Sequence, residues 1–156
     1  MRVARNVQLG LLEAHCEFDI VAHPHSVTSR ETARVAGISS TRMAKSVLID
    51  DRHGHYLLAL LPASQHLDLR KVGGPEQWRL TNESTIAALF NDCEPGAVPG
   101  LGEPYGLEML LDPQLIQQPE IYLEAGDHTN LLHMRMEQFR KLVPHAKVCD
   151  LCEVRY

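Results

Sequence analysis

Two apolar runs separated by a short polar turn constrain the fold of this chain more than any other feature of its sequence. Residues 43–50 and 56–61 are apolar enough to be buried strands. Asp51-Arg-His-Gly54 lies between them, and its glycine can take the positive φ that a tight turn requires. The sequence therefore predicts a β-hairpin around which the rest of the chain has to pack.

Four segments carry helical signals. The clearest is residues 29–36, because Thr28 and Glu31 form a capping box and Gly37 suits the far end. The other three are a first helix around Val7, Leu11 and Leu12, a helix at residues 84–90 capped by Thr81 or Asn82, and a helix at residues 137–143 before Pro144.

Further strands are expected at residues 18–22, 107–111, 121–124, 131–135 and 147–151. Residues 94–106 hold three prolines and four glycines, so we expect no regular structure there. Strands outnumber helices, which favours an α+β fold with a mixed, largely antiparallel sheet and flanking helices over a doubly wound parallel sheet. We see no internal repeat or linker and expect one domain over residues 1–156.

Length and charge narrow the function classes. A chain of 156 residues, 44% of them hydrophobic, has room for one core. No stretch approaches the roughly 18 apolar residues needed to cross a bilayer, so we expect a cytoplasmic protein with reduced cysteines, and a monomer by default. The net charge of −5 argues against nonspecific coating of nucleic acid, which depends on many Lys and Arg contacts to phosphate.

Lys45 stands out because it interrupts an apolar strand pattern. Burying an unpaired ammonium group is costly, so a lysine there lies either at a strand edge or in a cleft. Spacing alone favours the edge.

The loop from Pro99 to Gly106 is the second unusual feature. Its glycines let the backbone approach a ligand, and its N–H groups can form an oxyanion hole or hold a terminal ribose. It lacks the pattern of a nucleotide P-loop or a dinucleotide fingerprint, and an ordinary turn is an equally good interpretation.

Taken together, these segments resemble a known family. Ala44-Lys-Ser-Val47, the second strand ending Leu60-Leu-Pro-Ala63 before His66-Leu-Asp-Leu69, Cys93-Glu-Pro-Gly-Ala-Val-Pro99 and Gly100-Leu-Gly-Glu-Pro-Tyr-Gly106 follow one another in the chain. Their order and spacing are similar to those of the YbaK/aminoacyl-tRNA synthetase-associated domain, the YbaK/ProX family. The resemblance covers residues 23–151.

The resemblance implies a curved, barrel-like sheet and hydrolysis of the ester that joins an amino acid to the 3′-terminal adenosine of tRNA. It implies editing in trans, most plausibly of alanine or cysteine on tRNA for proline, without cofactor or metal. An aminoacyl-tRNA synthetase is a possible partner. The resemblance places Lys45, Gly100 and Gly102 in catalysis, and Pro104, Ser46, Tyr105 and Gly106 in substrate binding. Independently, no Ser or Cys has the sequence setting of an activated nucleophile.

Two segments depart from the family pattern. Asp127 and His128 stand where many relatives carry basic residues, so they are candidates for the substrate-binding rim. His23 and Thr28 are further candidates near the end of the first strand, although a surface turn is the better interpretation of that segment.

Other functions remain open at this stage. Cys149-x-x-Cys152 has half the spacing of a zinc ribbon, but no second pair is suitably placed, so we expect no metal. The same pair is a weak candidate for a redox switch. The main alternative is a non-catalytic module of the same fold that binds a tRNA end, a synthetase or a small ligand.

Overall fold

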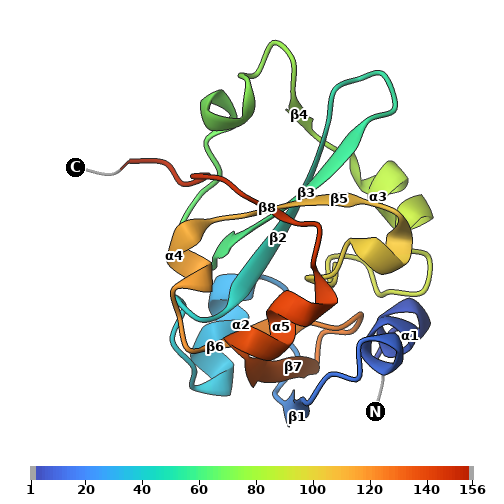
Figure 1. Cartoon of the computed structure of the whole chain (residues 1–156), viewed down its shortest axis with the longest axis vertical. Helices are drawn as coiled ribbons and strands as arrows, with labels where there is room; N and C mark the ends of the chain where they lie inside the picture. Colours follow the sequence, from blue (N-terminus) through green and yellow to red (C-terminus); the bar gives the residue numbers. More distant parts are fainter. Residues whose placement is uncertain (1–2, 155–156) are drawn as a thin grey trace.

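The computed structural model describes residues 3–154, which form two β-sheets with α-helices packed around them (Figure 1). The predicted α+β class is confirmed. Among the described strands, four pairings are antiparallel and two are parallel, so the mixed, largely antiparallel character is also confirmed.

The predicted hairpin is the centre of the larger sheet. Its strands β2 (Ala44–Asp50) and β3 (Tyr56–Pro62) pair antiparallel along their whole length. Gly54 has a φ of +88° in the turn, as expected, and Arg52 also has a positive φ of +69°. The strand order of this sheet is β4 (Arg79–Leu80), β2, β3, β5 (Glu108–Leu111) and β8 (Lys147–Val148), with β5 parallel to both of its neighbours.

The smaller sheet has β7 (Asn130–Arg135) between β1 (Asp19–Ala22) and β6 (Glu120–Glu124), all antiparallel. An isolated parallel bridge between Met43 and Tyr122 joins the start of β2 to β6. Between residues 3 and 154 the two sheets do not close into a barrel, so the barrel-like shape stays a prediction.

Helix α2 (Ser29–Ala36) has the limits that its sequence signals predict. The side-chain oxygen of Thr28 accepts the Glu31 N–H at 3.1 Å, and Gly37 is left-handed with a φ of +70°. Asn82, rather than Thr81, caps α3. The other long helices also lie where we expect them: α1 (Arg5–Glu13), α3 (Glu83–Leu89) and α5 (Met136–Leu142).

Several short elements escaped prediction. Asp112 is fully buried and accepts the Gln114 N–H at 2.8 Å, which starts the unforeseen helix α4 (Pro113–Ile116). The same carboxylate accepts the Leu151 N–H at 2.8 Å, so the last strand ends at Val148 and not, as we expected, at residue 151. The other unforeseen elements are β4 and the 3₁₀ helices η1 (Leu69–Val72) and η2 (Glu103–Tyr105).

The expectation that residues 94–106 hold no regular structure was therefore wrong at η2. A proline at the start of this 3₁₀ turn costs no hydrogen bond, because the first N–H groups of a helix have no partner within it. Gly106 ends the turn with a φ of +70°.

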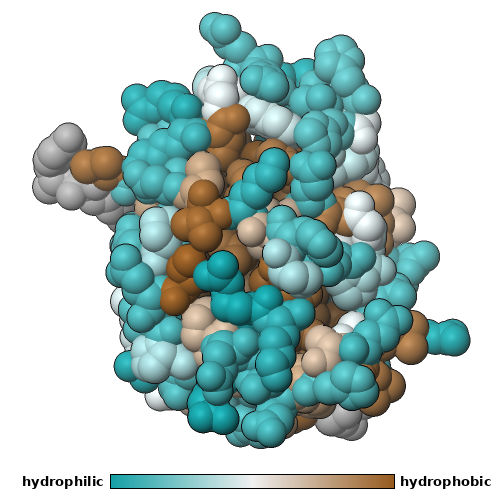
Figure 2. Space-filling model, in the orientation of Figure 1, coloured by the Kyte–Doolittle hydropathy of each residue, from teal (hydrophilic) through white to brown (hydrophobic). Residues whose placement is uncertain are grey.

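The main core lies between the two sheets and the outer helices. Val7 of α1, Leu58 and Leu60 of β3, Leu123 of β6 and Phe139 of α5 are each fully buried. Hydrophilic residues cover much of the face drawn in Figure 2, with hydrophobic residues visible between them. Within residues 3–154 no helix is long and apolar enough to cross a membrane.

Candidate active site

Lys45 lies where the two sheets separate. Along one side β2 pairs with β3, and along the other it pairs with Tyr122 at Met43 and with β4 from Ile49 onward. Lys45 falls between these two pairings, where a cavity of about 280 Å³ opens. Its half-buried side chain donates a hydrogen bond from Nζ to the Gln65 carbonyl at 2.7 Å. The lysine therefore lies in a cleft. It also has the character of an edge residue, because at this point β2 pairs with β3 on one side and the pairings on its other side lie at Met43 and from Ile49 onward.

The cavity combines apolar walls with a few charged groups. Four parts of the chain line it: the start of α2 with Val27 two residues before it, β2, α3 with the loop that follows, and the end of β6. The lining residues are Val27, Ser29, Ala44, Lys45, Ser46, Val47, Glu83, Ile86, Gly96, Val98 and Glu124. A mostly apolar pocket with few polar groups is typical of a small-ligand site.

Ser46 joins the strand to the glycine-rich loop. Its hydroxyl donates to the Pro99 carbonyl at 3.3 Å, which holds the loop beside Lys45. The part of the loop that borders the cavity is Gly96 and Val98, which precedes the predicted catalytic glycines.

Gly100 and Gly102 are packed into the protein. A Cβ on Gly100 would lie 2.5 Å from Leu123 Cδ2, so the backbone there lies directly against a core side chain. The Gly102 N–H donates to Met109 Sδ at 3.1 Å. The structure thus brings neither glycine into the group of residues that line the Lys45 cavity.

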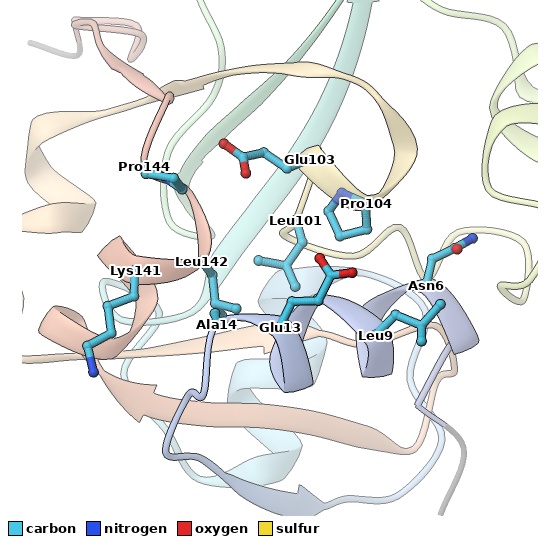
Figure 3. A pocket seen from close by; sticks show the side chains of 11 residues that line it. Asn6, Leu9, Glu13, Ala14, Leu101, Glu103, Pro104, Lys141, Leu142 and Pro144 are labelled. Carbon is cyan, nitrogen blue, oxygen red and sulfur yellow. The ribbon is translucent and has the colours of Figure 1, made fainter.

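Pro104, Tyr105 and Gly106 lie away from this cavity. Pro104 borders a separate cavity of about 440 Å³ between α1, η2 and α5, where Leu101, Glu13 and Lys141 also lie (Figure 3). The Tyr105 hydroxyl donates to Asp92 Oδ1 at 2.8 Å, and Gly106 caps η2. We call this second space the back cavity.

The predicted rim residues make mainly structural contacts. Asp127 accepts the N–H groups of Thr129 and Asn130, at 3.0 and 2.8 Å, which shapes the loop between β6 and β7. The Thr28 hydroxyl oxygen is used in the cap of α2. The structure therefore shows a fold-related use for each of these two side chains.

Two of the predicted site residues are histidines that keep one buried nitrogen each without a hydrogen-bond partner among residues 3–154. His128 Nε2 lies 2.5 Å from the Pro95 carbonyl and donates to it, which leaves Nδ1 without a partner. His23 Nδ1 donates to the Pro24 carbonyl at 2.8 Å, which leaves Nε2 without a partner. The His128 ring also contacts His25, with ring centroids 5.2 Å apart. His128 lies next to the cavity, because a Cβ on Gly96 would be 3.4 Å from its ring.

Glu124 is a cavity residue that sequence analysis missed. It is 8% exposed, and its Oε2 atom is buried without a hydrogen-bond partner among the described residues. Burial, and to a lesser extent Asp127, raises the pKa of this carboxyl to about 8. The bridge between Met43 and Tyr122 explains its place: Lys45 and Glu124 each come two residues later, on the same face of their strands. The predicted strand alone gave no sign that its last residue is buried.

The cysteines are free thiols of low reactivity. Burial, then Asp112, raises the pKa of Cys152 to about 12, and its Sγ donates to Asp112 Oδ2. Burial likewise raises the pKa of Cys149. A redox switch needs an accessible thiolate, so the structure argues against that function for this pair. Between residues 3 and 154 no three His, Cys, Asp or Glu side chains are grouped so as to hold a metal ion.

Comparison with known proteins extends these observations. The family model of the aminoacyl-tRNA editing domain matches residues 23–142. A crystal structure provisionally described as a trans-editing enzyme for prolyl tRNA synthetase is 28% identical, with 96% of each chain covered and a TM-score of 0.79. A scaffold protein from an epitope-grafting design study is 27% identical, with 97% of each chain covered and a TM-score of 0.79.

The structure of a hypothetical protein has a TM-score of 0.81 and is 18% identical, and the alignment covers 96% of this chain and all of the other chain. At this identity the similarity shows the fold alone. No curated protein matched significantly.

Proposed function

Since the chain belongs to the aminoacyl-tRNA editing domain family, we propose that it is an aminoacyl-tRNA deacylase that acts in trans on misacylated tRNA. The reaction is hydrolysis of the ester between the amino acid and the 3′-terminal ribose. The observation that carries this proposal is the half-buried Lys45 in a mostly apolar cavity, beside a glycine-rich loop.

We assign a small amino acid, such as alanine or cysteine, on tRNA for proline as the substrate. Support comes from the 28%-identical structure, which is described in terms of prolyl tRNA synthetase. The cavity of about 280 Å³ also suits a small side chain, with Val47, Ile86 and Val98 in its apolar lining. An apolar pocket distinguishes two amino acids that differ by one methylene group by about 1–3 kcal/mol of binding free energy. We therefore expect the pocket to exclude larger side chains rather than to select one particular small side chain.

In the proposed mechanism Lys45 orients the aminoacyl end of the tRNA. Its ammonium group exchanges the Gln65 carbonyl for an oxygen of the terminal nucleotide or of the ester. Water or a hydroxyl of the substrate then attacks the carbonyl carbon. Catalysis rests on positioning and on electrostatic stabilisation of the oxyanion.

The glycine-rich loop supplies N–H groups for the developing oxyanion in this proposal. Gly100 adjoins Pro99, whose carbonyl is held by Ser46 beside the cavity. A contribution from Gly102 requires its N–H to leave Met109 Sδ when substrate binds. Pro104, Tyr105 and Gly106 then support the loop from the back-cavity side, and His23, Thr28, Asp127 and His128 line the approach to the site.

The proposed partners follow from the reaction. The protein binds the aminoacyl-adenosine end of a tRNA and acts where translation takes place, in the cytoplasm, with a synthetase as a possible partner. Because Glu83 and Asp127 add negative charge near the cavity, we propose that binding of the tRNA body depends on only a few basic residues. We propose that it works as a monomer.

The decisive test is release of labelled amino acid from a panel of correctly and wrongly charged tRNAs. We expect wild-type protein to deacylate a wrongly charged tRNA, and Lys45→Ala to lower kcat/KM by about 100-fold or more, as loss of one electrostatic contact to a transition state does. Lys141→Ala, which removes a lysine of the back cavity, serves as the matched control and is expected to keep wild-type activity.

Thermal unfolding of both variants separates a chemical effect from a folding defect. Full activity of a folded Lys45→Ala variant would remove the proposed mechanism. No release from any tRNA, combined with binding of the tRNA end, would favour the non-catalytic binding module instead.

A further inference from the structure

Glu124 is the one carboxyl of the cavity that is both buried and partly unsatisfied in the described residues. Its Oε2 atom has no hydrogen-bond partner, and only 8% of the residue is exposed. Glu83, which lines the same cavity, is exposed at the start of α3. A buried acceptor without a partner destabilises the folded protein, so its presence next to a ligand-sized cavity calls for a ligand group that completes it.

The carboxylates of Asp127 and Glu83 outnumber the Lys45 ammonium group around Glu124, which favours a cationic ligand group. Lys45 from β2, Glu83 from α3, and Asp127 and His128 from the loop after β6 surround this end of the cavity. Burial, and to a lesser extent Asp127, raises the pKa of Glu124 to about 8, which favours the neutral carboxyl in the free protein at pH 7. A cation that enters the cavity stabilises the carboxylate form, which then accepts charge-assisted hydrogen bonds.

An aminoacyl ester carries one such group, the α-ammonium. We propose that Glu124 recognises the free α-ammonium group of the aminoacyl ester, an inference that rests on the proposed deacylase function. The Glu124 proton passes to solvent on binding, and its carboxylate pairs with the ammonium. Lys45 and Glu124 then hold two different parts of the substrate from adjacent strands, and esters whose amino group is acylated or replaced bind poorly.

The test compares two esters that differ only at the α position. The tRNA is charged with the amino acid that wild-type protein hydrolyses fastest, and half of it is converted to the α-hydroxy ester by nitrous acid. We expect wild-type protein to prefer the amino ester, and Glu124→Gln to reduce that preference by about tenfold, the effect of one charge-assisted hydrogen bond. The two esters differ in intrinsic reactivity, but this difference is the same for wild type and for Glu124→Gln. A change in the ratio of the two hydrolysis rates between the proteins therefore reports on residue 124.

Glu83→Gln is the matched control, because it removes a negative charge from the same cavity but not the buried carboxyl. We expect it to keep the wild-type ratio between the two esters. An equal fall on both esters in Glu124→Gln would show a structural role only and would overturn the proposal.

A second measurement does not depend on the variant or on turnover. The 3′-amide analogue of aminoacyl-adenosine is not hydrolysed as an ester, and its binding to wild-type protein is measured by calorimetry. We expect the analogue with a free amino group to bind about tenfold more tightly than its α-hydroxy counterpart. If the two analogues bind equally well and the protein still deacylates tRNA, the Glu124 proposal is overturned and the deacylase proposal stands. If wild-type protein hydrolyses no ester, both proposals are refuted.

Discussion

Glu124 makes the stability of the folded protein depend on pH. Its pKa is raised from 4.5 to about 8, first by burial and then by Asp127. The folded state therefore binds more protons than the unfolded state between these values, and the free energy of unfolding falls as pH rises through that window.

We expect Glu124→Gln to remove this part of the pH dependence. Relative to wild type, the variant should gain stability from pH 5 to pH 8, by up to about 1.4 kcal/mol for each unit that separates the two pKa values. Urea unfolding at both pH values measures the change. If the difference in free energy of unfolding between wild type and variant does not change with pH, the raised pKa of Glu124 is contradicted.

Single residues also show what the sequence can predict about the site. Lys45 was recognisable because a charge interrupts an apolar strand pattern, and the structure places it in a cavity. Glu124 was not, because its burial depends on the bridge that brings β6 against β2. The hydrogen bond from the Gly102 N–H to Met109 Sδ could not be predicted either, because it depends on the conformation of the folded loop.

Among the connections between elements, the turn after β6 is the most sensitive. Gly126 has a φ of +115°, and a Cβ there would lie 2.7 Å from the Ala4 Cβ and 3.2 Å from the Ala4 N. Ala4 in turn donates its N–H to the Ala125 carbonyl at 2.7 Å. The chain before α1 is thus packed tightly against the loop that carries Asp127 and His128.

We expect Gly126→Ala to destabilise the protein by about 2–4 kcal/mol, from backbone strain together with the steric clash. Gly106→Ala is the control: its φ of +70° also disfavours alanine, but no atom lies within 4 Å of the added Cβ. That change should cost only about 1 kcal/mol. Chemical denaturation compares the two, and equal losses would show that the Ala4 contact contributes nothing.

Elements with local signals were predicted well, and those that depend on distant partners were not. The hairpin β2–β3 and helix α2 follow from apolar runs, a turn glycine and a capping box. Helix α4 and the early end of β8 depend on Asp112, which contacts Leu151 from 39 positions away. No local pattern contains that contact.

For the whole molecule, we propose that the chain folds as one domain. Helix α1 precedes the part matched by the family model, yet Val7 and Leu11 belong to the main core. Near the other end, Leu151 is fully buried and its N–H is bound by Asp112. Helix α1 and Leu151 are therefore both held against the rest of the fold.

One domain should unfold in one cooperative transition. The single tryptophan, Trp78, is 5% exposed and packs with Ile49 and Leu57, so its fluorescence reports on the larger sheet. Far-ultraviolet circular dichroism reports on the helices, including α1. We expect the two signals to coincide in urea, and separate midpoints would contradict a single unit.

The arrangement of the strands was the least predictable feature at this scale. Strand positions were largely correct, but sequence alone did not show that β1, β6 and β7 form a sheet of their own. Strand order is set by pairings between residues far apart in the chain, such as Asp19 with His133. Hydrophobic pattern identifies strands and says little about their neighbours.

The unequal burial of the two ends of the described chain decides where a label belongs. Val3 and Ala4 are each 5% exposed, and Ala4 lies against Gly126, whereas Glu153 and Val154 are exposed near the end that projects from the body of the molecule (Figure 1). A fluorophore or affinity tag on the C-terminal side adjoins exposed residues and leaves the core packing intact. Because the Glu153 N–H donates to the His66 carbonyl at 2.8 Å, next to the Gln65 carbonyl that accepts from Lys45 Nζ, a linker has to hold the tag away from the Lys45 cavity. One on the N-terminal side adjoins the buried Val3 and Ala4 and would press on the turn at Gly126, so it costs more in packing.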